Sequence, residues 1–165
     1  MAGMGTTLVG IVARAGWIYV CNVGDSRCYR RRGGILKQLT EDHTLADEMV
    51  RQGLLDAAYA REASERNILT RAVGTNSQVE ADITSDEMRP GDRYLLCSDG
   101  LWGTVSDTDL LATMMGTVPQ DAARHLIDAA NRRGGPDNIT ALVVDVVESE
   151  SADAGNKPAG APSTS

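Results

Sequence analysis

The sequence has 165 residues, 42% of them hydrophobic and 24% charged, a composition that predicts one globular domain and excludes a fully disordered chain. A net charge of −7 disfavours binding to nucleic acid or to an anionic membrane surface. No apolar run reaches the roughly 20 residues that span a bilayer, and residues 1–7 show no secretory signal. We therefore expect a cytoplasmic protein with no membrane or nucleic acid as partner, and we expect it to be a monomer.

The first forty residues have the pattern of four short strands. Residues 6–13 and 17–23 are apolar runs joined by a tight turn at Ala15 and Gly16. Residues 27–31 and 35–39 flank a second turn that contains two glycines. The pattern predicts that these strands follow one another as an antiparallel meander.

The middle of the chain begins with a helical signal. Thr44 is a good N-cap for a helix that ends at Gly53. Residues 54–67 are polar and alanine-rich, which indicates a surface excursion of weak helical character. Residues 79–88 and 93–97 have the patterns of a half-exposed and a buried strand.

The last third combines two helices with one strand. Ser106 and Pro119 are typical first residues of helices, and each precedes an apolar stripe. Residues 139–147 form a long apolar strand pattern, after which the composition turns to Ser, Ala, Gly and Pro. We expect a folded unit over 1–148 and a disordered tail over 149–165. Because strands and helices do not alternate regularly, the order favours an antiparallel α+β fold.

Three aspartates lie at the ends of predicted buried strands. Asp25 and Asp99 directly follow such strands, and Asp137 lies two residues before the last one. If these strands run antiparallel, the three carboxylates meet at one end of the sheets. Carboxylate oxygens without an accompanying His or Cys suit Mg²⁺ or Mn²⁺ rather than Zn²⁺. The alternative is that each aspartate only forms a turn, since Gly-Asp-Ser, Asp-Gly and Pro-Asp-Asn are common turn sequences.

The two histidines have structural and functional interpretations. His43, beside Asp42, is either a solvated loop residue, which we expect, or a general acid or base. His125 lies in a predicted helix and is expected to be a packing or surface residue.

Seven motifs in order carry a family resemblance. They are Gly3-Met4-Gly5-Thr6-Thr7, Val23-Gly24-Asp25-Ser26-Arg27, Leu39-Thr40-Glu41-Asp42-His43-Thr44, Leu69-Thr70-Arg71-Ala72-Val73-Gly74, Pro90-Gly91-Asp92, Leu96-Cys97-Ser98-Asp99-Gly100-Leu101-Trp102 and Gly135-Pro136-Asp137-Asn138-Ile139-Thr140. Each is weak alone, but together they are specific. From residue 3 to about 147, the chain resembles the bacterial metal-dependent protein phosphatases of the PPM, or type 2C, family.

The resemblance implies two stacked antiparallel sheets flanked by helices, and hydrolysis of phosphoserine and phosphothreonine in proteins. It also implies a pair of Mn²⁺ or Mg²⁺ ions whose activated water attacks phosphorus in line. By motif, Asp99 and Asp137 correspond to ligands of the metal pair, and Asp25 to a ligand of a third, weaker metal position shared with Asp99. Residues 45–67 correspond to the flap that touches protein substrates. Phosphorylated proteins, and a serine/threonine kinase, are the implied partners.

The chain departs from the family pattern at its start. The family opens with a strand that carries a phosphate-binding Arg and an acidic ligand, followed by Asp-Gly-x-Gly-Gly-His, and this sequence contains neither. We therefore expect the C-terminal part of a phosphatase domain that is inactive or weak alone, with its catalytic residues still unassigned. The alternatives are a non-catalytic module that binds phosphoproteins or a kinase, and a simple divalent-cation protein.

Overall fold

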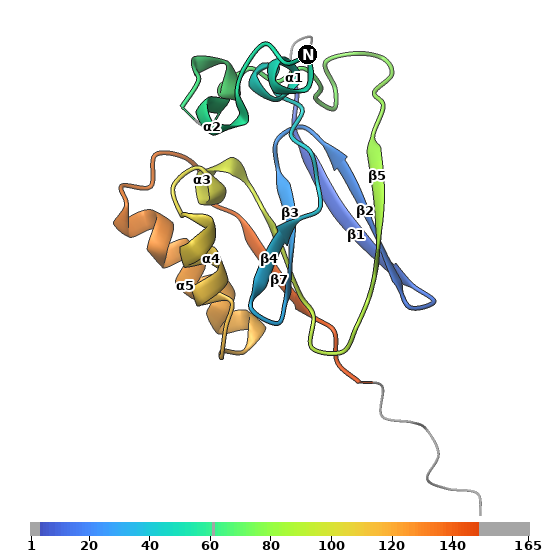
Figure 1. Cartoon of the computed structure of the whole chain (residues 1–165), viewed down its shortest axis with the longest axis vertical. Coiled ribbons are helices and arrows are strands. Elements are labelled where there is room, and N and C mark those ends of the chain that lie inside the picture. Colours follow the sequence, from blue (N-terminus) through green and yellow to red (C-terminus); the bar gives the residue numbers. More distant parts are fainter. Residues whose placement is uncertain (1–3, 61, 149–165) are drawn as a thin grey trace, which may run out of the picture.

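The computed structural model describes residues 4–60 and 62–148, in which two antiparallel sheets stack on each other (Figure 1). The first sheet has the order β1-β2-β5 and comprises β1 (Leu8–Arg14), β2 (Trp17–Val23) and β5 (Asp82–Glu87). The second has the order β4-β3-β6-β7 and comprises β3 (Arg27–Arg32), β4 (Ile35–Gln38), β6 (Arg93–Cys97) and β7 (Ala141–Asp145). The α+β fold with two stacked sheets is therefore confirmed.

The predicted hairpins are confirmed, but the four-stranded meander is wrong. β1 pairs with β2 and β3 pairs with β4, whereas β2 and β3 lie in different sheets. The burial patterns give the reason. β2 alternates between exposed and buried over most of its length, as suits a sheet with one solvated face, whereas the first three residues of β3 are all buried. The chain thus crosses from one sheet to the other at residues 24–26.

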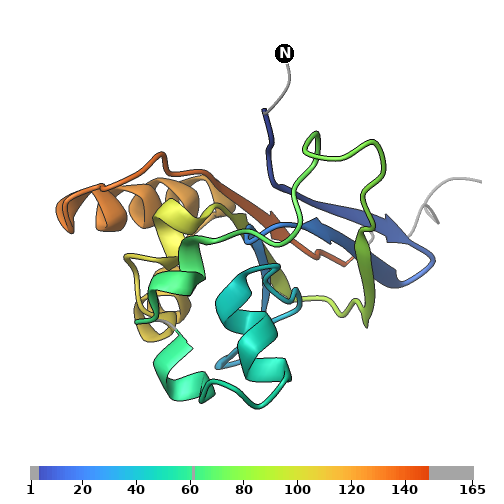
Figure 2. The same cartoon turned by 90° about the horizontal axis from the view of Figure 1, so that it is seen from above.

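Helices cover one face of the second sheet and one end of the sandwich. α3 (Asp99–Trp102), α4 (Asp107–Thr113) and α5 (Pro119–Arg132) lie along the second sheet (Figure 1). α1 (Leu45–Arg51), α2 (Ala57–Ala60) and the 3₁₀ turn η1 (Ser64–Asn67) gather at the end where the chain crosses between sheets (Figures 1 and 2). The predicted caps form, because Thr44 and Ser106 accept hydrogen bonds from the backbone N–H groups of Asp47 and Asp109.

Strand β6 is buried on both faces and separates two hydrophobic cores. Tyr94 and Leu96 pack between the sheets, with Ile18 and Val20 of β2. The alternate residues, Leu95 and Cys97, pack against the helices, in a core that the sequence fills without any Phe. Burial on both faces explains why this segment reads as a continuous apolar run rather than as an alternating one.

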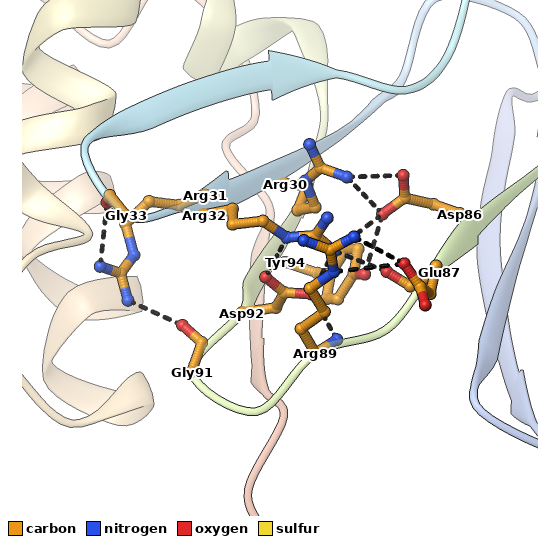
Figure 3. A network of polar contacts seen from close by, with 10 residues as sticks. All are labelled: Arg30, Arg31, Arg32, Gly33, Asp86, Glu87, Arg89, Gly91, Asp92 and Tyr94. Atoms are coloured by element: carbon orange, nitrogen blue, oxygen red, sulfur yellow. Dashed lines mark hydrogen bonds and ion pairs between the residues drawn. The ribbon is translucent and has the colours of Figure 1, made fainter.

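An arginine–carboxylate network ties the sheets together at the end away from α1 (Figure 3). Arg30 donates to both carboxylate oxygens of Asp86, at 2.6 and 2.8 Å, and so links β3 to β5 of the other sheet. Arg32 donates to both oxygens of Asp92 at 2.7 Å. Asp92 also accepts the backbone N–H of Arg89 at 2.8 Å, so the loop before β6 is held by the same carboxylate.

Two further expectations concern the ends of the chain and the membrane. The predicted tail over 149–165 lies outside the described residues. Among the helices of the described residues, none is both long enough and apolar enough to cross a membrane.

The network predicts a stability loss on neutralising Asp92, whose side chain is 1% exposed. Burial raises its pKa, but the hydrogen bonds from Arg32 and the Arg89 N–H, with the charge of Arg32, outweigh burial and hold the pKa below its usual value. Asp92→Asn should lower the free energy of unfolding by about 1.5–3 kcal/mol at pH 7, measured by urea denaturation. Because a lowered folded-state pKa stabilises only the ionised form, the difference should shrink as the pH falls below about 4.

The control is Glu87→Gln, which removes an exposed ion pair with Arg89 in the same network. It should change stability by less than about 0.5 kcal/mol. Equal losses in the two variants would contradict the role given to Asp92.

Candidate metal and phosphate site

A pocket of about 510 Å³ lies where the strand ends meet the helical end of the molecule. Asp25, Asp99 and Asp137 all line it, although they come from three separate segments. The rest of the lining comes from the chain before β1, the crossing between β2 and β3, the segment around η1, α3 with the residues on either side of it, and the loop before β7: Thr7, Ser26, Arg66, Asn67, Leu69, Ser98, Gly100, Trp102, Gly103, Thr104 and Pro136. The residues expected to hold a metal therefore share one cavity.

Asp25 lies in the crossing between the sheets, directly after a glycine that the backbone requires. Gly24 has φ +102°, and a Cβ at this position would lie 2.7 Å from the Cβ of Thr7. Only glycine therefore fits without displacing Thr7. On the other side, the indole N–H of Trp102 donates to the backbone carbonyl of Asp25 at 2.9 Å. These contacts fix the backbone that carries the carboxylate.

Asp99 and Asp137 belong to two loops that are bonded to each other. The Ser98 hydroxyl donates to the carbonyl of Asn138 at 3.1 Å and accepts the N–H of Thr140 at 3.0 Å. A Cβ on Gly100 would collide with the Asn138 carbonyl oxygen, so glycine permits this close approach. The two carboxylates thus sit on a shared scaffold at the ends of β6 and β7.

The charged form of Asp25 is disfavoured in this pocket. Asp25 is 9% exposed, and burial together with the nearby charge of Asp99 raises its pKa to about 6. Asp99 is half-buried and Asp137 is exposed. A bound divalent ion would offset both the desolvation of Asp25 and its repulsion by Asp99, so these carboxylates fit a cation.

The described residues do not make a complete metal site. Within residues 4–60 and 62–148, no group of three or more His, Cys, Asp or Glu side chains is close enough to hold an ion. The three aspartates are therefore neighbours around one pocket rather than a closed ligand set, and their assignment as ligands stays a prediction.

A buried ion pair supports the wall of this pocket. The guanidinium of Arg27, on β3, donates to Asp42 through Nε at 3.0 Å and through Nη2 at 2.7 Å. Its flat face lies over the ring of Trp102, 3.5 Å from the centroid. Asp42, Arg27 and Trp102 thus form a continuous support that ends on the Asp25 backbone.

His43 is not the solvated loop residue that the sequence suggests. It is fully buried, its Nδ1 accepts the N–H of Gly24 at 3.0 Å, and its Nε2 lies 3.0 Å from Asp82. The local sequence hides this burial, because the partners of His43 lie 19 and 39 positions away. His125 is exposed on α5, in agreement with a surface role.

Comparison with known proteins decides the family. A family model described as protein phosphatase 2C matches residues 2–139. The chain belongs to this family. Its relatives include the serine/threonine protein phosphatase PstP of Mycobacterium tuberculosis, 41% identical over 148 residues, or 90% of this chain and 29% of PstP. The serine/threonine phosphatase stp of Listeria monocytogenes is 40% identical over 144 residues, which cover 87% of this chain and 57% of stp.

Solved structures agree with the fold. A crystal structure of Mycobacterium tuberculosis PstP superposes with a TM-score of 0.84 at 40% identity, covering 88% of this chain and 62% of that one. A structure of the PstP catalytic domain in complex with two manganese ions gives a TM-score of 0.80 at 40% identity, covering 90% and 61%. The chain thus spans less than two thirds of these relatives.

The close packing at Gly24 predicts that adding one methyl group to this residue strongly destabilises the fold. Gly24→Ala should lower the free energy of unfolding by at least about 2 kcal/mol, because it combines an unfavourable positive φ with a collision against Thr7. Gly33→Ala is the matched control, since Gly33 has φ +57° and open space at its Cβ position. Its loss should be about 1 kcal/mol. Equal shifts of the two urea midpoints would contradict the close packing described at Gly24.

Proposed function

We propose that this chain is the C-terminal part, over residues 1–148, of a metal-dependent protein serine/threonine phosphatase, with phosphorylated proteins as substrates. Asp25, Asp99 and Asp137 would contribute ligands for Mn²⁺ or Mg²⁺. One observation carries the proposal: in a chain of the protein phosphatase 2C family, these three aspartates from separate segments line a single pocket. The two manganese ions in the PstP structure support the choice of metal.

The residues of the pocket suit phosphate ester hydrolysis with bound ions. When present, divalent ions supply an activated water and neutralise phosphoryl oxygens. The chain's part is to hold carboxylates at fixed positions: Asp25 from the crossing, Asp99 and Asp137 from the two bonded loops. Burial strengthens the attraction of Asp25 for a cation, because its charge is poorly solvated.

The flap assignment has support from the same pocket. Arg66 and Asn67, at the end of the predicted flap over 45–67, line the cavity together with Leu69. Because α1, α2 and η1 gather at this end of the molecule, a phosphorylated peptide that reaches the aspartates would pass beside them (Figure 1). We propose that this segment contacts the protein substrate.

The edges of the sandwich support the need for a further segment. β1 and β7 are outer strands of their sheets, and within the described residues neither has a second partner strand. A cleft of about 420 Å³ opens between them, lined by Thr7, Leu8 and Val9 on one side and by Leu96, Thr140 and Leu142 on the other. Free edges beside an apolar cleft are sites where further strands can pair. We propose that the family's Asp-Gly-x-Gly-Gly-His segment, and the strands around it, complete the fold and the metal site here.

A complementation assay tests the proposal. The 165-residue chain is assayed for release of phosphate from a phosphothreonine peptide with Mn²⁺, alone and mixed with a polypeptide that carries the family's opening strands and its Asp-Gly-x-Gly-Gly-His segment. We expect little or no hydrolysis by the chain alone and Mn²⁺-dependent hydrolysis by the mixture. A mixture that binds Mn²⁺ and retains the peptide without hydrolysing it would favour the non-catalytic binding module instead.

The ligand assignment has its own test by calorimetry. Asp99→Asn should weaken Mn²⁺ binding by more than about tenfold, because it removes a charge next to Asp25. Asp121→Asn, an exposed acidic residue on α5 outside the pocket lining, is the control and should leave the affinity unchanged. Equal affinities of Asp99→Asn and the unmodified chain would overturn the assignment.

A further inference from the structure

The buried imidazole of His43 has no role in the proposed function, yet it contacts the residue before Asp25. Its Nδ1 accepts the N–H of Gly24 at 3.0 Å, and its own backbone N–H donates to the Gly24 carbonyl at 3.0 Å. The side chain is 0% exposed. Both backbone polar groups of Gly24 are therefore bonded to His43, and the Gly24 carbonyl also accepts from the side-chain amide of Asn22 at 3.2 Å.

The contacts of the ring allow one arrangement of its proton. A backbone N–H can only donate, so Nδ1 must be an unprotonated acceptor toward Gly24. Nε2 then carries the hydrogen and donates to the carboxylate of Asp82 across 3.0 Å. A carboxylate that receives the far N–H of an imidazole fixes both its tautomer and its orientation.

Asp82 is itself fixed from the segment that follows the flap. Arg71 donates from Nη1 to Asp82 at 2.6 Å, on the carboxylate oxygen that His43 does not contact. The neighbouring Thr70 donates its backbone N–H to the carbonyl of His43 at 2.9 Å. A chain of contacts thus runs from Arg71 through Asp82 and His43 to Gly24.

We propose that His43 is a positioning residue for Asp25, which it orients through the Gly24 peptide without touching the metal. The inference rests on the proposed function, in which Asp25 binds a divalent ion. The backbone of Gly24 is held at both polar groups, since its N–H donates to the ring of His43 and its carbonyl accepts from the backbone N–H of His43 and from the side-chain amide of Asn22. The ring of His43 holds this backbone with a hydrogen bond that water cannot replace at a fully buried site.

Four variants of the full 165-residue chain, compared with Asp25→Asn, test the proposal. His43→Ala removes the acceptor for the Gly24 N–H. His43→Asn restores an acceptor, because its Oδ1 is separated from Cα by the same number of covalent bonds as the imidazole Nδ1. Asp82→Asn alters the group that fixes the ring. Thr40→Val is the matched control, since it also leaves a buried backbone N–H, that of Cys28, without its side-chain acceptor, but between the sheets rather than at the crossing.

The measurements are Mn²⁺ affinity by calorimetry, stability in urea, and the hydrogen exchange rate of the Gly24 amide by NMR. We expect His43→Ala to weaken Mn²⁺ binding by about 10–100-fold and to speed exchange at Gly24. His43→Asn should recover most of the Mn²⁺ affinity and most of the protection of the Gly24 amide. In both measurements, Asp82→Asn should lie between His43→Ala and His43→Asn. Thr40→Val should lose stability while its Mn²⁺ affinity stays within twofold of the unmodified chain.

Two outcomes separate this inference from the proposed function. If Asp25→Asn binds Mn²⁺ like the unmodified chain, the assignment of Asp25 is wrong, and the positioning role falls with it. If Asp25→Asn weakens binding but His43→Ala does not, the proposed function stands and the positioning role is overturned. The role is also overturned if His43→Ala and Thr40→Val lose equal affinity, or if His43→Asn exchanges its Gly24 amide as fast as His43→Ala.

Discussion

The crossing of the chain from one sheet to the other at Gly24, Asp25 and Ser26 is the constraint on which the pocket depends. At this point the chain leaves β2, one face of which is largely solvated, and enters β3, which begins buried. The turn carries an acidic residue into a largely buried position. Hydrogen bonds from neighbouring residues hold the backbone of this turn, namely those of His43 and Asn22 with Gly24 and that of Trp102 with Asp25.

The charges around the pocket follow from that position. Arg27 is the nearest described cation along the chain, but its guanidinium is directed to Asp42, Tyr29 and the face of Trp102 rather than to Asp25. Burial, together with the nearby charge of Asp99, therefore raises the pKa of the Asp25 carboxyl. A cation beside Asp25 would offset both the burial of this carboxylate and its repulsion by Asp99.

Local sequence signals predicted most of the elements. The turn at Ala15 and Gly16, where both residues have positive φ, gave the first hairpin, and Thr44 and Ser106 gave two helix starts. Pairing between sheets was not predictable from these signals, because alternation says which face of a strand is buried but not which strand lies beside it. The short helix α3 was not predicted, because it has only four residues and begins just one residue after β6 ends.

The meeting of the three aspartates at one pocket was predictable from the sequence, but the contacts that support them were not. The sequences Gly24-Asp25 and Asp99-Gly100, at the ends of predicted strands, indicated two of the aspartates. The family motif at residues 135–140 supported the third, Asp137. The burial of His43 depends on Asp82 and Gly24, which are distant in sequence, so no local pattern indicates it. Similarly, the stacking of Arg27 on Trp102 joins residues 75 positions apart, and only the folded chain brings them together.

The convergence of three separate segments on one cation-binding pocket is the central claim, and paramagnetic broadening by Mn²⁺ tests it most directly. Substoichiometric Mn²⁺ is added to the ¹⁵N-labelled chain, and the loss of each amide signal is followed. We expect the signals from residues 24–26, 98–100 and 136–138 to broaden together at the lowest Mn²⁺ concentrations. Broadening of only one of these segments, or broadening first at acidic surface residues outside the pocket, would contradict it.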